Sequence, residues 1–185
     1  MKKSIGSQLT LYPMPIGVIG TKVNGKNNFV LAAHFGIVSH QHLLVSLSKT
    51  HYTNQGIKEN KALTINLVDE NMIAKADYVG SVSGNKVDKS NVFQTFEKET
   101  KMPIIEESPL TIECEVIDNY SIAGFDNFIC TIKNVYVKEE YLDEKNKINY
   151  EKLKPILFEF PTYQYLKTGE VLGKCLSFKE KMEEN

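Results

Sequence analysis

The strongest constraint on the fold lies in residues 110–137, where two long strand-like segments flank a short turn. The segments LTIECEVIDNY and NFICTIKNVYV alternate in part between apolar and polar residues, and SIAGFD separates them. Successive side chains of a β-strand point to opposite faces, so this alternation places apolar side chains on one face. These residues therefore predict a long antiparallel hairpin with one buried face.

Shorter strands are predicted in the first half of the chain. Two prolines interrupt the apolar residues 12–20, which favours an edge or bulged strand. The pair Asn24-Gly25 is typical of a two-residue hairpin turn, because both residue types tolerate positive φ. Further strands are predicted at residues 29–33, 43–48 and 62–68.

Two short helices are predicted between and after these strands. Residues 53–60 begin with Thr53, whose hydroxyl suits a helix N-cap, although Gly56 weakens the helix. Residues 70–79 place apolar side chains at helical spacing, with Asp69 or Asn71 as the cap. Six or so strands with few helices predict a mainly β fold, a closed or half-closed barrel, rather than an alternating βαβ fold. The charged residues 138–147 predict a solvated loop.

Composition excludes several classes of function. The 185 residues carry 22 Lys+Arg and 23 Asp+Glu, for a net charge of -1, so no basic field exists to hold a nucleic acid. No apolar run reaches membrane-spanning length. We expect one domain over residues 1–185 in a soluble, cytoplasmic protein without nucleic-acid or membrane partners. The odd count of cysteines, without Cys-x-x-Cys spacing, favours free, buried thiols at Cys114, Cys130 and Cys175.

A local anion site is one interpretation of residues 48–53. A predicted strand ends here and a predicted helix begins, so free backbone N–H groups and the helix dipole would attract a phosphate. The cationic or hydroxyl side chains nearby are Ser48, Lys49, Thr50, His51 and Thr53. The alternative is a capped helix with solvated polar neighbours. Neither a Walker loop nor a Gly-x-Gly-x-x-Gly motif is present.

Other catalytic patterns are weak. His40 and His42 could share one face of a strand, but no third ligand at suitable spacing joins them, so no metal site is predicted. Ser83-Gly84 lacks the remainder of a Gly-x-Ser-x-Gly motif. No residue is assigned as catalytic from the sequence.

Several segments, taken in order, resemble the flavin reductase-like family and most closely its flavoredoxin branch. They cover about residues 12–173, and their order and spacing are more specific than any single motif. The segments are Tyr12-Pro13-Met14-Pro15, Asn28 to Gly36, residues 45–67, Ala76-Asp77-Tyr78-Val79-Gly80, Ser83-Gly84, Val87-Asp88-Lys89, Glu107 to Cys114, Tyr163, Leu166, Gly169 and Leu172-Gly173.

This resemblance implies a six-stranded Greek-key split β-barrel with short helices that binds FMN at the interface of a homodimer. The phosphate would lie near Ser48, Lys49, His51 and Thr53, with Lys89 as a further candidate. The isoalloxazine ring would lie against Leu31, Ala32, Ala33, His34 and Phe35 and receive polar contacts from backbone groups and Ser46. Asn28 would contact the phosphate or the ribityl chain.

Three residues depart from the flavoredoxin pattern. His34 stands where flavoredoxins usually carry Trp, which implies weaker stacking on the flavin and a more polar site. His51 stands where Arg is common, so phosphate binding is expected to depend on pH, because histidine titrates near neutrality. Asp126 replaces a frequent His.

The function implied is that of an FMN-dependent oxidoreductase. NADH, NADPH or a protein donor would reduce the bound FMN, which would pass electrons to a further acceptor. His34, if it faces the ring, is the candidate for proton delivery. Two alternatives stay open: a non-enzymatic FMN-binding electron-transfer module, and a split-barrel binding protein that has lost flavin.

Overall fold

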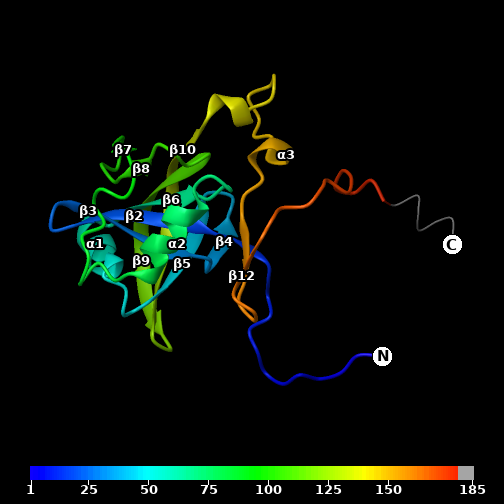
Figure 1. The fold of residues 1–185 in the computed structure, drawn as a ribbon, viewed down its shortest axis with the longest axis horizontal. Coiled ribbons are helices and arrows are strands. Elements are labelled where there is room, and N and C mark those ends of the chain that lie inside the picture. The colour runs from blue at the N-terminus through cyan, green and yellow to red at the C-terminus, as the bar shows by residue number, and fades with distance from the viewer. Residues whose placement is uncertain (179–185) are drawn as a thin grey trace.

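The computed structural model describes residues 1–178, and its main feature is a seven-stranded antiparallel sheet (Figure 1). The prediction of a mainly β fold is confirmed. The sheet has one strand more than predicted, because Phe35–Ser39 forms a separate edge strand on β5. In spatial order the strands are β3 (Lys26–Ala32), β2 (Gly17–Val23), β6 (Ala62–Leu67), β9 (Leu110–Ile122), β10 (Phe125–Val137), β5 (His42–Ser48) and β4 (Phe35–Ser39).

The long hairpin is confirmed as β9 and β10, which pair along their whole length. Its turn is tighter than predicted, since Phe125 already pairs with Ile122 and only two residues connect the strands. Those residues, Ala123 and Gly124, have φ of 45° and 86°. Positive φ at both central positions matches the right-handed twist of the flanking strands.

The Asn24-Gly25 turn is also confirmed and joins β2 to β3. The prediction of an edge or bulged strand over residues 12–20 is wrong for residues 17–20, because β2 lies between β3 and β6. The prolines do not disturb this pairing, since both precede Gly17. Pro15 instead belongs to β1 (Met14–Pro15), an edge strand of a small sheet with β11 (Leu157–Glu159) and β12 (Gln164–Leu166).

Two hydrophobic clusters pack on opposite faces of β2 and β3. Ile19 and Val30 belong to one cluster with residues of β5, β6, β9 and β10, and Val18 and Phe29 belong to the other. The second cluster is covered by α2 (Ile73–Ser81), which buries Ala76 and Val79. Because both faces are buried here, β2 and β3 carry apolar side chains at successive positions, as at Val18-Ile19 and Phe29-Val30, without strict alternation.

The three cysteines are free, as predicted, but only two are buried. Cys114 and Cys130 lie in the hydrophobic cluster that contains Ile19 and Val30, and burial raises the pKa of Cys130 to about 12. Cys175 is exposed, because the C-terminal segment runs away from the sheet (Figure 1).

Helix α1 (Thr53–Asn60) has the predicted bounds, but its start differs from the prediction. Tyr52 is the N-cap residue and makes no side-chain cap bond. The Thr53 hydroxyl instead accepts a hydrogen bond from Asn28 Nδ2 at 2.8 Å. A Cβ atom on Gly56 would lie 2.2 Å from the Lys22 carbonyl oxygen, so glycine permits the close packing of α1 on β2.

The remaining elements lie at the periphery. They are the β7 (Thr95–Phe96) and β8 (Ile104–Ile105) pair, the 3₁₀ turn η1 (Glu139–Tyr141) within the predicted charged loop, and α3 (Tyr150–Leu153). Within residues 1–178, no helix combines the length and apolar character that crossing a membrane requires.

Candidate functional site

Four cavities that share lining residues form the candidate site. The apolar cavity has a volume of about 280 Å³ and is lined by Leu9, Leu11, Tyr12, Met14, Ala33, His34, Phe35, Leu44 and Ser46. The aromatic cavity, of about 450 Å³, is lined by Ile16, Leu31, Ala32, Ala33, His51, Asp77, Gly80, Ser81, Phe158, Phe160, Tyr163 and Tyr165.

The other two cavities are polar. The cationic cavity, of about 470 Å³, is lined by Lys49, Thr50, His51, Tyr52, Asn54, Gln55, Lys58, Asn85 and Asp126. The amide cavity, of about 380 Å³, is lined by Val23, Asn24, Lys26, Asn27, Asn28, Tyr52, Gly84, Asn85, Lys86, Val87, Asp88 and Lys89.

Shared residues set the order of the cavities. Ala33 lines the apolar and the aromatic cavity, His51 lines the aromatic and the cationic cavity, and Tyr52 lines the cationic and the amide cavity. The groove therefore changes along its length from apolar and aromatic walls to cations and amides.

The wall of the aromatic cavity comes from the small sheet. Phe158 on β11 and Tyr165 on β12 have ring centroids 5.8 Å apart, and the Tyr165 hydroxyl donates to Asp77 Oδ1 at 2.6 Å. Burial and the nearby Asp77 carboxylate raise the pKa of Tyr165. Leu31 and Ala32 of β3 add aliphatic side chains to the lining of the same cavity. Such a slot suits a flat ring system, because aromatic faces stack on planar groups.

His34 lies in the apolar cavity, between β3 and β4. Its Nε2 atom is 3.0 Å from the Tyr12 hydroxyl, and its carbonyl accepts from the Ser46 backbone N–H at 3.0 Å. Its ring centroid is 5.8 Å from that of Phe125. The Tyr12 contact gives His34 a hydroxyl with which it could exchange a proton.

Residues 48–51 connect β5 to α1 and form a tight turn. The His51 backbone N–H donates to the Ser48 carbonyl at 3.0 Å, and the hydroxyls of Ser48 and Thr50 lie 2.9 Å apart. The His51 side chain lies between the aromatic and the cationic cavity. Burial and the nearby Lys89 ammonium lower the pKa of His51, so the free imidazole is mostly neutral at pH 7.

Lys89, the further candidate for the phosphate site, uses its N–H donors within the protein. Its Nζ atom donates to the carbonyls of Phe29, Val79 and Val82, each at 2.8 Å. An ammonium has three N–H donors, so none is left for a ligand. Burial lowers the pKa of Lys89 to about 8, and the side chain remains protonated at pH 7.

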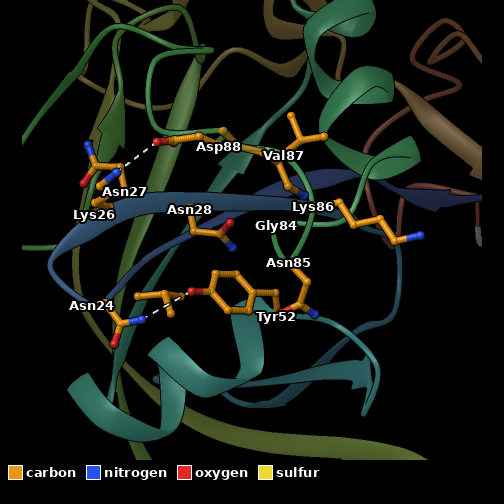
Figure 2. A pocket seen from close by; sticks show the side chains of 12 residues that line it. Asn24, Lys26, Asn27, Asn28, Tyr52, Gly84, Asn85, Lys86, Val87 and Asp88 are labelled. Atoms are coloured by element: carbon orange, nitrogen blue, oxygen red, sulfur yellow. Dashed lines mark hydrogen bonds and ion pairs between the residues drawn. The ribbon is translucent and has the colours of Figure 1, made fainter.

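Asn28 and Gly84 define the wall of the amide cavity beside Tyr52 (Figure 2). A Cβ atom on Gly84 would lie 2.5 Å from Asn28 Oδ1 and 2.6 Å from Tyr52 Cδ1. Gly84 of the Ser83-Gly84 pair noted in the sequence thus has a steric role. Asn28 is buried and donates to Thr53, as described above.

The structure brings most of the predicted residues to this groove. Four of them line the aromatic cavity: Leu31, Ala32, Ala33 and His51. Ala33 also lines the apolar cavity, together with His34, Phe35 and Ser46. Lys49 lines the cationic cavity, and Asn28 and Lys89 line the amide cavity. Ser48 and Thr53 line none of the four, although Ser48 lies in the turn beside them.

The aromatic wall was missed as part of the site. Phe158 and Phe160, like Tyr163 and Tyr165, are two positions apart, so each pair points to one face of an extended segment. This two-residue spacing is the sequence signal from which the aromatic wall could have been predicted. Among residues 1–178, no group of three or more His, Cys, Asp or Glu side chains is placed to hold a metal ion.

Comparison with known proteins gives a consistent result. The flavin reductase like domain family matches residues 9–167 of the chain. A flavoredoxin from Methanosarcina acetivorans superposes with a TM-score of 0.92 at 34% identity, covering 98% of this chain and 100% of that one. A flavoredoxin of Desulfovibrio vulgaris (Miyazaki F) gives 0.88 at 32% identity, covering 96% and 98%.

A more distant structure shares the fold. An FMN-binding protein from Thermus thermophilus superposes with a TM-score of 0.80 at 22% identity, covering 94% of this chain and 97% of that one. The split-barrel fold expected from the sequence is therefore confirmed.

Proposed function

Because the chain belongs to the flavin reductase-like family, we propose that it binds FMN in the four-cavity groove and acts as an oxidoreductase. Family membership gives the coarser function, a flavin-related redox activity. The finer proposal is that NADH, NADPH or a protein donor supplies the electrons and that a further molecule accepts them. We also propose a cytoplasmic location.

The observation that carries the proposal is the order of polarity along the groove. FMN has a flat, largely apolar ring at one end, a hydroxylated chain in the middle and a phosphate at the other end. The groove presents aromatic and aliphatic walls, then His51, then lysines and amides. The residues present thus fit the group in its full length.

The proposed contacts follow from this order. The ring would lie in the aromatic cavity, between Leu31 and Ala32 on one side and the β11–β12 aromatic residues on the other. The phosphate would lie at the turn 48–51, where Lys49 and His51 supply charge and the paired hydroxyls of Ser48 and Thr50 supply a donor. Lys89 would act through space, since its donors are used.

FMN, when bound, supplies hydride and single-electron chemistry that no side chain can provide. The chain's own contribution is to orient the ring and exclude water from it. The Tyr12–His34 pair could also move a proton between the two side chains beside the ring. No other acid or base is assigned.

We further propose that the protein acts as a homodimer with the groove at its interface. The N-terminal residues and the C-terminal segment up to residue 178 extend away from the main sheet in Figure 1 and carry exposed apolar residues. Leu11 is 79% exposed and Leu172 is 93% exposed. Leu9 and Leu11 also line the apolar cavity, so a partner that covers the N-terminal arm (residues 1–11) would close one end of the groove.

The test is the visible absorption spectrum of the purified protein before and after addition of FMN and desalting. We expect oxidised-flavin bands that survive desalting and bleach when NADH or NADPH is added. Retained flavin that neither nucleotide reduces would favour an electron-transfer module with a protein donor. A protein that retains no FMN and does not turn over free FMN with either nucleotide would contradict the proposal.

A further inference from the structure

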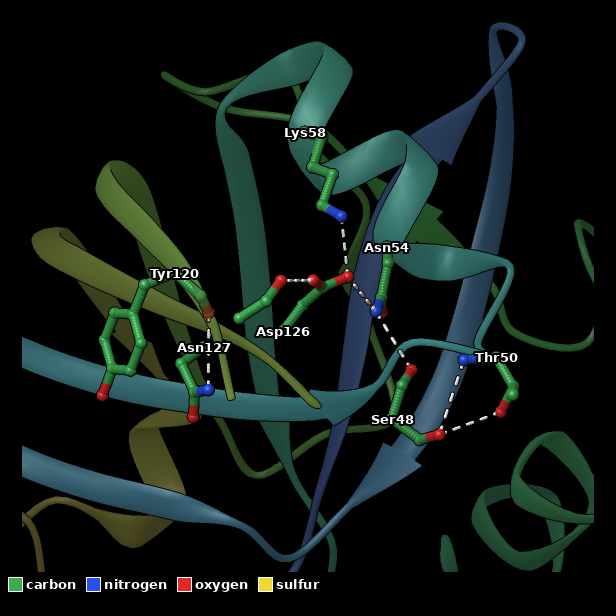
Figure 3. Close-up of polar contacts among 8 residues, drawn as sticks. Ser48, Thr50, Asn54, Lys58, Tyr120, Asp126 and Asn127 are labelled. Carbon is green, nitrogen blue, oxygen red and sulfur yellow. Dashed lines mark hydrogen bonds and ion pairs between the residues drawn. The ribbon is translucent and has the colours of Figure 1, made fainter. Parts of the chain in front are cut away.

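Asp126 is a buried carboxylate at the end of β10 nearest the turn 48–51. Its side chain is 3% exposed and accepts three hydrogen bonds (Figure 3). Lys58 Nζ donates to Oδ2 at 2.7 Å and Asn54 Nδ2 donates to the same oxygen at 2.9 Å. Ser121 Oγ donates to Oδ1 at 2.8 Å. Both donors to Oδ2 come from α1, so Asp126 joins the long hairpin to this helix.

Asn54 carries this link onward to the turn. Its Nδ2 atom also donates to the Ser48 carbonyl at 3.0 Å, and the same carbonyl accepts the His51 backbone N–H. Asn54 Oδ1 is buried and has no hydrogen-bond partner among the described residues. A buried unpaired acceptor is unfavourable, so the stabilising contribution of this side chain comes from its two N–H bonds.

A second bond joins the hairpin to the same turn. The Lys49 backbone N–H donates to the Gly124 carbonyl at 2.9 Å, and Gly124 lies in the β9–β10 turn. The path from Asp126 through Asn54 therefore fixes the Ser48 carbonyl, which precedes Lys49, and the Gly124 carbonyl fixes the backbone N–H of Lys49.

The carboxylate is charged at neutral pH. Burial alone would raise the pKa of Asp126, but the three donated hydrogen bonds outweigh burial and lower it. Hydrogen bonds to charged acceptors are short and about twice as strong as neutral ones. A neutral residue at this position would hold Asn54 less firmly.

We propose that Asp126 is a positioning residue for phosphate recognition, which holds the turn 48–51 through Asn54 in the geometry that accepts the FMN phosphate. The inference rests on the proposed function. Asp126 itself does not bind phosphate, because its charge has the same sign. It sets the contribution of the phosphate to flavin affinity rather than the affinity for the ring.

The experiment compares FMN with riboflavin, which has the same ring and no phosphate. Dissociation constants for both would be measured by quenching of flavin fluorescence with wild type and with Asp126→Asn. We expect the FMN constant to rise about tenfold, equivalent to one weakened charged hydrogen bond, and the riboflavin constant to change less than about twofold. A general loss of structure would raise the dissociation constants of FMN and riboflavin equally.

Asn54→Ala and Glu115→Gln complete the design. Asn54→Ala removes the intermediate group, so it should raise the FMN constant alone and add little to Asp126→Asn in the double variant. It also carries the test if Asp126→Asn does not fold. Glu115→Gln removes a carboxylate from an exposed ion pair with Lys133 on the same hairpin and should leave both constants unchanged.

The outcomes separate the two proposals. If the wild type binds FMN more tightly than riboflavin, and the ratio of the two dissociation constants is the same in Asp126→Asn and in Asn54→Ala as in the wild type, the inference alone is overturned. A wild type that binds neither flavin overturns the proposed function and the inference with it.

Discussion

His51 is the residue whose chemistry most directly ties the groove to solution conditions. Its imidazole lies between the aromatic and the cationic cavity, and burial followed by the Lys89 charge keeps its pKa low in the free protein. A phosphate dianion beside the ring would favour the protonated form. Binding of FMN is then linked to uptake of a proton.

This linkage predicts that FMN binds more tightly as pH falls from 8 to 6.5. One linked proton changes affinity by at most about tenfold per pH unit. The other titratable side chains of the cationic cavity are Lys49, Tyr52, Lys58 and Asp126. Lys89 also gains charge as pH falls through this range, because its pKa is about 8, so the comparison with a variant at His51 is needed to isolate the contribution of the imidazole. Fluorescence titration with FMN at several pH values measures the slope.

Riboflavin and His51→Arg provide the controls. Riboflavin lacks the phosphate, so its affinity should not follow this profile. Arginine stays charged, so the FMN profile of His51→Arg should be flatter than that of wild type. A wild-type FMN profile that is flat, or that rises with pH, would contradict the role of His51.

Lys89 illustrates a lysine whose function is to satisfy backbone carbonyls. Lys89→Met leaves the three carbonyls of Phe29, Val79 and Val82 without this donor, and we expect a loss of about 3 kcal/mol in the free energy of unfolding. Urea denaturation measures the change. Lys86→Met, at an exposed position in the same loop, should stay within about 0.5 kcal/mol of wild type. Equal effects of the two substitutions would refute the structural role.

At the scale of elements, α1 is fixed by close contact with β2 and by its bonds to the long hairpin. Gly56 allows the first of these, since a side chain there would meet the Lys22 carbonyl. In an isolated helix, alanine is more favourable than glycine by about 1 kcal/mol. Tertiary packing reverses that preference here.

Gly56→Ala should therefore destabilise the protein, by about 1–3 kcal/mol, because α1 must move away from β2. Thermal unfolding followed by circular dichroism would detect it. Glu59→Ala, at an exposed position of the same helix, is the matched control and should have little effect. A Gly56→Ala variant as stable as wild type would mean that the contact relaxes without cost.

Local sequence patterns predicted where the strands and turns lie better than they predicted which strands pair with each other. Alternation identified β9 and β10, and Asn24-Gly25 identified the β2–β3 turn, because both signals are contained in a few adjacent residues. The central place of β2 depends on pairing with β6, more than 40 residues away, and two nearby prolines suggested the opposite.

The difference between local and long-range contacts also explains which residues of the site could be predicted from the sequence. The polar turn 48–51 was found because its residues are consecutive. The structural bonds of Lys89 could not be predicted from the sequence, because its three acceptors lie on β3 and at both ends of the segment 79–82. The hydroxyl of Thr53 suits a helix cap in the sequence, whereas in the structure it accepts a hydrogen bond from Asn28 of β3.

At the scale of the whole molecule, the extended arms leave apolar surface uncovered in one chain. Apolar surface of this kind is stabilised when a second surface covers it, at about 25 cal/mol per Å². The N-terminal arm, with Leu9 and Leu11, is the part that also borders the groove.

Leu11→Asp should therefore weaken the proposed homodimer and raise its dissociation constant at least about tenfold, because a charge would be buried without a partner. Analytical ultracentrifugation over a range of concentrations measures this. Ile117→Asp makes the same change at a 55% exposed apolar position on β9 and should leave the dimer intact. A wild type that sediments as a monomer while retaining FMN would count against the dimer.

The contrast between the cysteines has a practical consequence for studying the arms. Cys114 and Cys130 lie inside the barrel with raised thiol pKa values, so they are shielded from alkylating reagents and poorly ionised. Cys175 lies exposed on the C-terminal arm. A maleimide fluorophore or spin label added to the native protein should therefore attach at this one position, and the wild-type sequence already carries a reporter of how that arm moves and what it touches.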